Sequence, residues 1–311
     1  MRIAVLQGGL SAEREVSLRS GLQVASALGR RGHDVEPIDL DGEVWDRLRH
    51  GGYDCVFVAL HGRLGEDGTA QGMLELLGLP YTGSGVLASA LCIDKTRAND
   101  LLRSQGLMIP KFEEFEGDDV EELSDRYGLP VVVKPVREGS TIGLTIARDV
   151  DALASGLVLA RRYDSRVLVQ RFVEGTEITV GVLATPGICV LPTLEITYEN
   201  ETYDYDAKYT AGRSHHIIPA RIPEPARRAA ADAAERAFRA LGCEGMARVD
   251  FIISPDCTPW LLEVNTVPGL TEVSLLPDAA RAAGIPFDDL CDRLVRHAIE
   301  RRSSAVGPKA V

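Results

Sequence analysis

Three oxygen-bearing side chains near the end of the sequence have the types and spacing of a divalent-cation site. Asp250 lies in the apolar run ARVDFII, while Glu263 and Asn265 close a second run, WLLEVN, after the turn-rich SPDCTP. Carboxylate and amide oxygens are hard ligands that suit Mg²⁺ bound to substrate phosphates. Two carboxylates that face each other without a cation would be costly. The alternative is a surface hairpin in which Arg248 neutralises the acids.

The two apolar runs are expected to pair as a hairpin, which fixes the neighbours of these side chains. We expect Ile253 to pair with Trp260 across the turn. In that register the two acids face each other and Arg248 faces Asn265. Successive side chains of a strand alternate between its faces. One face is therefore expected to carry Leu261, Glu263 and Asn265, and the other Trp260, Leu262 and Val264.

A lysine-bearing loop in the middle of the sequence has the composition of a phosphate-binding lid. In VVVKPVREGSTIG, residues 131–143, an apolar strand delivers Lys134 and the following loop contains Gly139, Ser140 and Thr141. Only five of the 34 basic residues are lysines, so a lysine that ends a buried strand calls for an explanation. Backbone amides and hydroxyls of such a loop can fold over phosphates. The spacing is not that of a P-loop, and the alternative is a flexible surface turn.

The N-terminal segment shows signs of a ligand site at the carboxyl edge of a parallel sheet. Gly8 and Gly9 turn an expected strand into a helix, a position where backbone amides bind anions. Glu13 could bind an amine there, and His61 ends another expected strand, where ligands of open α/β sheets bind. A tight turn, a helix-capping acid and a packed histidine are the respective alternatives. With Asp39, the glycines also keep a dinucleotide-binding fold open.

The order of the expected elements predicts an α/β fold with three domains. Residues 1–95 alternate short apolar strands, LPYTG among them, with helical patterns, which predicts a parallel sheet. Residues 96–180 begin with a helix and continue with strands around another helix. Residues 181–311 add strands, such as the continuous ICVLPTLEI, that are expected to form a mixed sheet. Helices are expected at 224–241 and 286–301.

Composition and charge exclude several classes of function. Apolar residues make up 45% and charged residues 26% of the 311-residue chain, as in a folded globular protein. The net charge of -12 argues against a nucleic-acid binder, which would need a basic surface. We find no signal peptide or run of eighteen apolar residues, and six dispersed cysteines indicate neither zinc nor disulfides. We therefore expect a cytoplasmic protein that binds neither nucleic acid nor membrane.

Six segments follow one another in the order of one enzyme family, from residue 3 to about residue 300. They are GGLSAEREVSLRSG, LHGRLGEDGTAQGMLELLGLPYTGSGVLASALCIDK, VVVKPVREGSTIG, YDYDAKY, ARVDFI and LLEVNTVPGLTEVSLLP. Together they resemble the D-alanine-D-alanine ligases, which are members of the ATP-grasp superfamily. The resemblance implies a three-domain α/β ATP-grasp ligase with an N-terminal parallel, Rossmann-like domain.

The activity that this resemblance implies is the ATP-dependent ligation of two D-alanines. ATP phosphorylates the carboxylate of the first D-alanine, and the amine of the second attacks the acylphosphate. The product is the dipeptide of peptidoglycan precursors. The implied cofactors are ATP and two Mg²⁺ ions, for which Mn²⁺ can substitute, and the implied partners are D-alanine and a second copy of the chain in a homodimer.

The resemblance also implies a role for each matching residue. The expected ATP contacts are Lys95, Lys134, Thr141, Gln170, Arg171, Phe172, Val173 and Glu177, although Gln170 and Arg171 depart from the hinge sequences of the family. The metal ligands are Asp250, Glu263 and Asn265. The catalytic set is Glu13, Ser140, Tyr209, Arg248 and Gly269, in which Glu13 holds an ammonium and Arg248 and the Gly269 amide stabilise an oxyanion. The substrate contacts are His61, Lys208, Ser274 and Leu275.

Two other classes of function are compatible with parts of the sequence. A Rossmann-type oxidoreductase would use Gly8, Gly9 and Asp39 but would leave the acidic hairpin unexplained. A non-catalytic ATP-grasp homologue would be expected to have lost a metal ligand, and none is lost.

The segment around Tyr209 resembles dipeptide-forming rather than depsipeptide-forming members of the family. We therefore expect D-alanyl-D-alanine as the main product and D-lactate as a poor second substrate. His215 and His216 follow in the same segment. They are expected to be a solvated pair at the tip of a lid, and the alternative is that they bias the site between an amine and a hydroxyl nucleophile.

Overall fold

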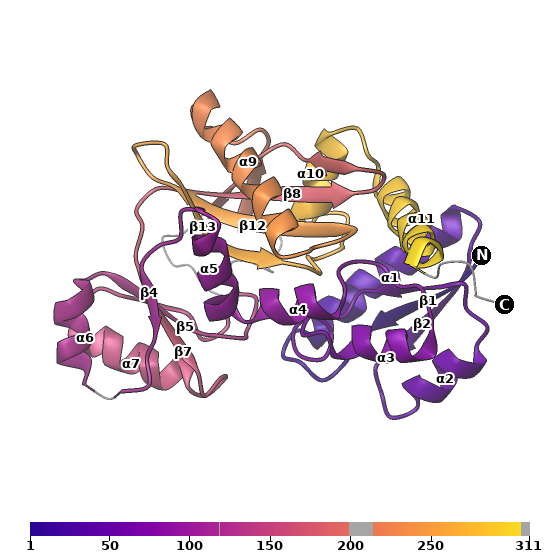
Figure 1. The fold of residues 1–311 in the computed structure, drawn as a ribbon, viewed down its shortest axis with the longest axis horizontal. Coiled ribbons are helices and arrows are strands. Elements are labelled where there is room, and N and C mark those ends of the chain that lie inside the picture. The colour runs from indigo at the N-terminus through magenta and orange to yellow at the C-terminus, as the bar shows by residue number, and fades with distance from the viewer. Residues whose placement is uncertain (118, 199–213, 306–311) are drawn as a thin grey trace.

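The computed structural model describes residues 1–117, 119–198 and 214–305, which form three sheets and the helices around them (Figure 1). In Figure 1 the N-terminal sheet lies at the lower right, the central sheet at the lower left and the C-terminal sheet above them. In this part of the chain, no helix is long and apolar enough to cross a membrane.

The N-terminal sheet is parallel and has the strand order β2-β1-β3. Its central strand, β1, has no exposed surface at residues 3–6, which explains the uninterrupted apolar run in the sequence. After each strand, a helix returns the chain to the edge of the sheet at which the parallel strands begin. The elements are β1 (Arg2–Gln7), α1 (Arg14–Arg30), β2 (Asp34–Asp39), α2 (Val44–His50), β3 (Cys55–Val58) and α3 (Thr69–Leu77).

The central sheet is antiparallel and has the order β4-β7-β5-β6. Helices α6 and α7 pack on it, and Leu123 and Leu153 join Val133 and Val169 in one apolar cluster. Helices α4 and α5 lead into this sheet from the N-terminal one (Figure 1). The elements are α4 (Val86–Ile93), α5 (Lys95–Ser104), β4 (Phe112–Glu114), α6 (Val120–Tyr127), β5 (Val131–Pro135), β6 (Thr145–Ala147), α7 (Val150–Ala160) and β7 (Val167–Arg171).

The C-terminal sheet has the order β11-β10-β8-β12-β13, with β9 paired to β8. Helix α9 buries a row of alanines that packs with Phe251 of β12. Helix α10 packs on β8, and α11 packs on α1 of the N-terminal sheet. The elements are β8 (Thr176–Ala184), β9 (Ile188–Val190), β10 (Leu194–Tyr198), β11 (Ser214–Ile217), α9 (Glu224–Ala240), β12 (Met246–Ile253), β13 (Pro259–Asn265), α10 (Leu275–Ala282) and α11 (Phe287–Ala305).

Several details differ from the sequence-based expectations. Every described strand pair of the C-terminal sheet is antiparallel, so the expected mixed sheet is wrong. The run ICVLPTLEI forms two strands, because Pro192 between them has no N–H for a ladder. LPYTG contributes a single bridge, from Tyr81 to Val56. Helices α4, α6 and α10 are not among the expected elements. Each has only eight residues, which is a short window for a helical pattern, and α4 is almost wholly apolar.

The β12–β13 hairpin contains a register shift beside its two acids. The acids pair with each other and Arg248 pairs with Asn265, as the sequence predicts. Beyond the acids the register changes by one residue, so Ile253 pairs with Pro259 and not with Trp260. The expected pairing at the turn is therefore wrong, although the pairing at the acids is confirmed.

This β-bulge changes which side chains share a face. Leu261 and Val264 both lie in the buried apolar core, whereas Leu262 lines a cavity together with Glu263. The predicted grouping of Leu261 with Glu263 is therefore wrong, because a bulge places one extra residue on its strand and interrupts the alternation of faces. The consequence is an apolar side chain next to the acid in the cavity wall.

Gly181 of β8 tests the packing of α10 on the C-terminal sheet. A Cβ atom there would lie 2.7 Å from Leu191 and 2.8 Å from Leu276. We expect Gly181→Ala to lower the free energy of unfolding by about 1–3 kcal/mol. Gly72 in α3 is the control, because a Cβ atom there would meet nothing within 4 Å. Gly72→Ala should raise stability by about 0.5–1 kcal/mol. Urea unfolding measures both, and effects of the same sign would contradict this account.

Candidate active site

Asp250 of β12 is held by donors from two strands. Its Oδ1 accepts hydrogen bonds from Arg248 Nε at 2.9 Å and from the Thr179 hydroxyl at 2.7 Å, and its Oδ2 accepts from Arg248 Nη2 at 2.7 Å. All three side chains are buried. Arg248 thus neutralises Asp250, as the hairpin alternative supposes, but β12 lies between β8 and β13 and not at the surface. Thr179 carries no signal in the sequence, because its role depends on the pairing of β8 with β12.

Glu263 faces a buried ammonium from helix α5. Its Oε2 lies 3.5 Å from Lys95 Nζ, and this Nζ also donates to the carbonyl oxygen of Glu138 at 2.6 Å. Lys95 begins α5 and is buried. Each carboxylate of the hairpin therefore has a cationic neighbour supplied by the protein, which offsets the cost of its burial.

The donor set of the hairpin fits Mg²⁺. Asp250 and Glu263 are cross-strand neighbours that line one cavity, and Asn265 lines the adjoining cavity. The Asn265 Oδ1 accepts a hydrogen bond from the Val267 amide at 3.0 Å, which fixes its direction. No group of three or more His, Cys, Asp or Glu residues that could hold a metal is found within the described residues. The chain itself thus offers two carboxylates and an amide, all oxygen donors.

Two adjoining cavities bring together residues that are distant in the sequence. Their volumes are about 60 and 20 Å³, and Lys95, Gly139 and Glu263 are in the walls of both. The larger is also lined by Lys134, Thr141, Glu177, Asp250 and Leu262, and the smaller by Glu66, Cys92, Asn265 and Thr266. The expected phosphate contacts and the expected metal ligands therefore surround a shared space.

The loop between β5 and β6 has a strained backbone at its tip. Ser140 has a φ of 53° and Thr141 a φ of 65°, in the left-handed region that residues with side chains rarely adopt. Such a conformation costs about 1–3 kcal/mol per residue and persists only where other contacts fix it. One such contact is the hydrogen bond that the Ser140 hydroxyl donates to the Glu13 carboxylate. The loop is thus anchored to the N-terminal sheet.

Glu13 does not cap the helix that it precedes. It occupies the N-cap position of α1 without a side-chain capping bond, so the capping alternative is not supported. One of its oxygens accepts from Ser140, and the other, Oε2, is buried without a hydrogen-bond partner. A Cβ atom on Gly62 or on Gly139 would lie 2.9 or 3.0 Å from Oε2, so glycines allow this close approach. A buried carboxylate oxygen that lacks a donor is suited to an ammonium group.

His61 lies in a buried chain of hydrogen bonds. Its Nδ1 lies 3.3 Å from Glu66 Oε1, its Nε2 lies 3.2 Å from Ser20 Oγ, and this hydroxyl accepts from the Leu270 amide at 3.3 Å. Burial lowers the pKa of His61, but the hydrogen bond to Glu66 and the charges of Glu66 and Glu13 outweigh burial and hold this pKa above its ordinary value. Burial raises the pKa of Glu66. The chain links the smaller cavity to the segment after β13.

The glycine turn after β1 is closed by the protein's own side chains. The Gly8 amide donates to Ser17 Oγ at 2.8 Å, and the Gly9 amide donates to Asp39 Oδ1 at 3.1 Å. The hydrogen bond from Arg14 holds the pKa of Asp39 below its ordinary value. Both amides and the acid that a dinucleotide site would use are thus already engaged. The structure therefore supports a tight turn here and not a Rossmann-type nucleotide site.

The segment expected to bind adenine divides between two environments. Gln170 of β7 is buried, and its Nε2 is a donor without a hydrogen-bond partner. Arg171, Phe172 and Val173 line a separate groove of about 760 Å³. The structure therefore does not bring these three side chains to the cavity that Lys134 lines. If this segment contacts an adenine base there, it would do so through its backbone groups.

The expected second-substrate residues lie at the start of α10. Ser274 is the N-cap residue and Leu275 is the first residue of the helix. The Ser274 side chain does not cap the helix, and its Oγ lies 2.7 Å from Thr271 Oγ1. A Cβ atom on Gly269 would lie 3.1 Å from Ser274 Oγ, so Gly269 adjoins this helix start. Unsatisfied amides at a helix N-terminus favour an anion such as a carboxylate.

Four expected residues belong to the stretch 203–220, which includes β11. Lys208 and Tyr209 lie outside the described residues. His215 and His216 do not form a pair at a lid tip, because they lie on β11 and pair with β10. His215 is exposed, whereas His216 is half-buried and bonds Asp278 of α10. Their expected place as a solvated pair is therefore wrong for His216.

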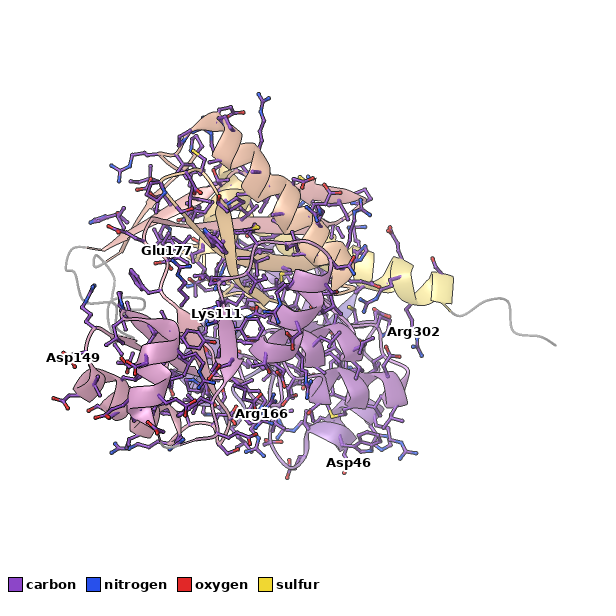
Figure 2. All side chains as sticks on the ribbon, turned by 60° about the vertical axis from the view of Figure 1, so that its left-hand side comes forward. Asp46, Lys111, Asp149, Arg166, Glu177 and Arg302 are labelled. Atoms are coloured by element: carbon purple, nitrogen blue, oxygen red, sulfur yellow. The ribbon has the colours of Figure 1, made fainter. Side chains whose placement is uncertain are left out.

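The start of α5 is held by a residue for which the sequence gives no functional sign. Arg166, just before β7, donates hydrogen bonds to the carboxylates of Asp94 and Glu114. Asp94 in turn caps α5 by accepting a backbone N–H of its first turn at 3.1 Å, directly before Lys95. Figure 2 shows Arg166 among the side chains where the central and N-terminal parts of the ribbon meet. No local pattern could have indicated a contact between residues so far apart in the sequence.

Comparison with known proteins identifies the family. The model described as D-ala D-ala ligase C-terminus matches residues 101–296, and the one described as D-ala D-ala ligase N-terminus matches residues 43–84. The D-alanine--D-alanine ligase of Desulforudis audaxviator (strain MP104C) is 51% identical over 304 residues, which cover 96% of this chain and 99% of that relative. The chain belongs to the D-alanine-D-alanine ligase family.

Solved structures of this ligase family share the fold. The D-alanine--D-alanine ligase from Bacillus anthracis complexed with ATP aligns with a TM-score of 0.84 and 33% identity, over 98% of this chain and 99% of that one. The VanG D-Ala:D-Ser ligase from Enterococcus faecalis aligns with a TM-score of 0.81 and 31% identity, over 96% and 99%. The predicted fold class, an ATP-grasp ligase with an N-terminal parallel α/β part, is confirmed.

Arg166→Gln tests the support of α5 through its pH dependence. Burial raises the pKa of Asp94, but hydrogen bonds from Arg166 and Thr96 lower it more, and Arg166 also lowers the pKa of Glu114. Both folded-state pKa values thus lie below the ordinary values of 3.8 and 4.5. The stabilisation by these carboxylates is therefore present above pH 4.5 and is lost as the pH falls through the lowered values.

We expect Arg166→Gln to lose about 1–3 kcal/mol of unfolding free energy at pH 7, and the difference from the unmodified protein to shrink as the pH is lowered from about 5 to about 3.5. Urea unfolding across this range measures both. Arg239→Gln is the control, because Arg239 pairs with Glu235 on an exposed helix face, and its loss should stay below about 0.5 kcal/mol. A difference for Arg166→Gln that does not change with pH would contradict the account.

Proposed function

We propose that this chain uses ATP to join two D-alanines into D-alanyl-D-alanine for peptidoglycan precursors. ATP phosphorylates the carboxylate of the first D-alanine, and the amine of the second displaces phosphate from the acylphosphate. The observation that carries the proposal is the hydrogen bond from Ser140 to Glu13, which joins an amine-binding carboxylate to the loop beside the lysine cavity. A relative named D-alanine--D-alanine ligase at 51% identity supports the same reaction.

The first D-alanine is proposed to bind with its ammonium on Glu13. The buried Oε2 of Glu13 supports this, because it lacks a donor in the protein. We propose that Ser140 and Tyr209, which lies outside the described residues, extend the hydrogen-bond chain from Glu13, and that His61 orients the pocket from the other side. The carboxylate of the substrate then meets the terminal phosphate in the space shared by the two cavities.

ATP is proposed to lie between the central and C-terminal sheets. Lys95 and Lys134 are buried and line the larger cavity, which supports their contact with phosphates. The remaining contacts are proposed for Thr141 and Lys208 with the phosphates, Glu177 with the ribose, and Gln170 with the backbone of Arg171, Phe172 and Val173 around adenine. A solved relative complexed with ATP has the same fold.

Two Mg²⁺ ions, or Mn²⁺ in their place, are proposed to bind at Asp250, Glu263 and Asn265, with Glu263 shared. Such ions neutralise charge on the transferred phosphoryl group. A cation on Asp250 would weaken its contacts with Arg248, because the metal and the guanidinium share the charge of one carboxylate. We therefore expect Arg248 to turn toward the substrate in the loaded enzyme, where it and the amide of Gly269 would donate to the oxyanion, a contribution of about 3 kcal/mol per donor.

The second amino acid is proposed to bind by its carboxylate at Ser274 and Leu275. The uncapped N-terminus of α10 supports this placement. D-alanine is the proposed nucleophile. D-serine is the second candidate, because the D-Ala:D-Ser ligase of Enterococcus faecalis shares the fold at 31% identity.

The proposed domains are residues 1–95, 96–180 and 181–311, each of which contains most of one sheet. The limit at 180 falls inside β8, a strand of the C-terminal sheet. The proposed compartment is the cytoplasm. All six cysteines are free, as expected in a reducing compartment.

A homodimer is proposed with α3 and α4 in the interface. Leu76 of α3 and Leu87 of α4 are 81% and 73% exposed, and the two helices are in contact. Exposed apolar side chains on neighbouring helices are typical of protein interfaces.

Phosphate release with ATP, Mg²⁺ and D-amino acids tests the activity. With equal D-alanine, D-serine and D-lactate at pH 6 and pH 8.5, mass spectrometry should find mainly D-alanyl-D-alanine. Glu263→Gln should lower turnover on the order of 10²–10³-fold while the protein stays folded, because a lost metal contact removes charge stabilisation. Glu235→Gln, on an exposed face of α9, should keep full activity. Phosphate release that does not depend on D-alanine, or a predominant product with D-serine or D-lactate, would contradict the proposal.

Sedimentation velocity tests the assembly. We expect a dimer at micromolar concentration, and a monomer for the double variant Leu76→Lys with Leu87→Lys, because two buried charges would oppose association. Leu22→Lys is the control, since Leu22 is 58% exposed on α1, outside the proposed interface. A monomeric unmodified protein, or a dimer that the double variant does not disturb, would refute this interface.

A further inference from the structure

His216 and Asp278 form a contact between the C-terminal sheet and helix α10. His216 Nδ1 lies 2.5 Å from Asp278 Oδ2, and because a carboxylate only accepts hydrogen bonds, Nδ1 carries the hydrogen. The other oxygen, Oδ1, accepts from the guanidinium of Arg281, three residues further along α10. Arg281 also reaches the carbonyl oxygen of Glu272 at 3.4 Å. Both oxygens of Asp278 are thus occupied.

Asp278 lies in the first turn of α10, near the proposed carboxylate subsite. Its amide donates to the Ser274 carbonyl oxygen at 2.9 Å, which closes that turn. Asp278 therefore lies three residues after Leu275, about 4.5 Å further along the helix axis. An acid in the first turn stabilises a helix by itself. That reason does not explain why this one is buried and held at both oxygens.

A carboxylate at this position affects any anion bound at Ser274 and Leu275. Like charges at such a distance repel each other, more so where water is partly excluded. The positive end of the helix dipole attracts the substrate carboxylate, and Asp278 alone would cancel part of that attraction. His216 and Arg281 oppose this effect, because their donors engage both oxygens of Asp278.

We propose that His216 and Arg281 are positioning residues that determine the affinity for the second amino acid. By holding Asp278 they set the electrostatic potential at the start of α10, where the carboxylate of the second substrate binds. Neither residue touches the substrate, and both act through Asp278. The inference rests on the proposed function, because it takes the position of the second-substrate subsite from it.

A second cluster of the same composition supplies a matched control. On α11, Asp292 Oδ1 lies 2.8 Å from His33 Nε2, and Asp292 Oδ2 accepts from Arg296 at 2.7 Å. The side chains of Arg281 and Arg296 are 65% and 62% exposed, and those of the two aspartates are 11% and 10% exposed. This cluster ties α11 to the N-terminal sheet and has no part in the proposed site. It therefore reports the stability effect of such a cluster alone.

Steady-state phosphate release, fitted with separate KM values for ATP and for the first and second D-alanine, tests the proposal. His216→Leu and Arg281→Gln should each raise the KM of the second D-alanine about three- to tenfold. The reason is that each change leaves the charge of Asp278 less well compensated, and this charge is only partly screened by solvent. The KM values of ATP and of the first D-alanine should stay within about twofold. Asp278→Asn should leave the second KM unchanged or lower it, and His216→Leu with Asp278→Asn should restore it.

The control variants His33→Leu and Arg296→Gln should change urea stability but not the second KM. If the cluster only stabilised the fold, Asp278→Asn would raise the KM of the second D-alanine as much as His216→Leu does. That result would overturn the proposal. An unchanged second KM in Arg281→Gln would also overturn it, and this variant serves if His216→Leu fails to fold. If the unmodified protein releases no phosphate in response to D-alanine, the proposed function fails instead, and the two failures are distinguishable.

Discussion

The Lys95 ammonium binds the carbonyl oxygen of Glu138 and lies 3.5 Å from the carboxylate of Glu263, and the rest of the site depends on this contact. It joins the start of α5 to the loop after β5 of the central sheet and to strand β13 of the C-terminal sheet. Buried charges are tolerated when they are paired and hydrogen-bonded. Lys95 and Arg248 supply that pairing for the acids of the β12–β13 hairpin. The protein can therefore hold these two carboxylates together without depending on a bound cation to fold.

The N-terminal sheet joins the same space through two further contacts. The hydrogen bond from Ser140 to Glu13 fixes the tip of a strained loop, and the chain through His61 and Ser20 reaches the amide of Leu270. Each contact crosses between sheets that fold from separate parts of the sequence. The proposed amine, phosphate and carboxylate sites thus lie at one junction, which a reaction of two amino acids with ATP requires.

The parts of this structure that local sequence determines are predictable. The strand–helix alternation of the first 95 residues predicts the parallel sheet, and the turn SPDCTP predicts the hairpin in which Asp250 meets Glu263. The bulge at Leu262 is not predictable in this way, because the packing of Leu261 and Val264 in the core decides it. The bulge shifts the register at the turn by one residue but leaves the pairing of Asp250 with Glu263 unchanged.

Contacts between distant segments are not readable from one sequence. The contacts of Arg166 with Asp94 and of His216 with Asp278 join residues 72 and 62 positions apart, which only tertiary packing brings together. For the same reason Thr179 gives no sign that it holds Asp250. The residue types of the site are therefore largely predictable from motifs, whereas the side chains that position them follow from tertiary packing.

The most direct test of this account follows the oxygen atoms of the substrate carboxylate. D-alanine labelled with ¹⁸O at both carboxyl oxygens, incubated with ATP and Mg²⁺, should transfer one ¹⁸O to each phosphate released. The bridging oxygen of the acylphosphate leaves with the phosphoryl group when the second amine attacks. The other ¹⁸O of the first D-alanine should remain in the amide of the dipeptide. Phosphate that contains no ¹⁸O while dipeptide forms would contradict the phosphorylation of D-alanine at the junction of the three sheets.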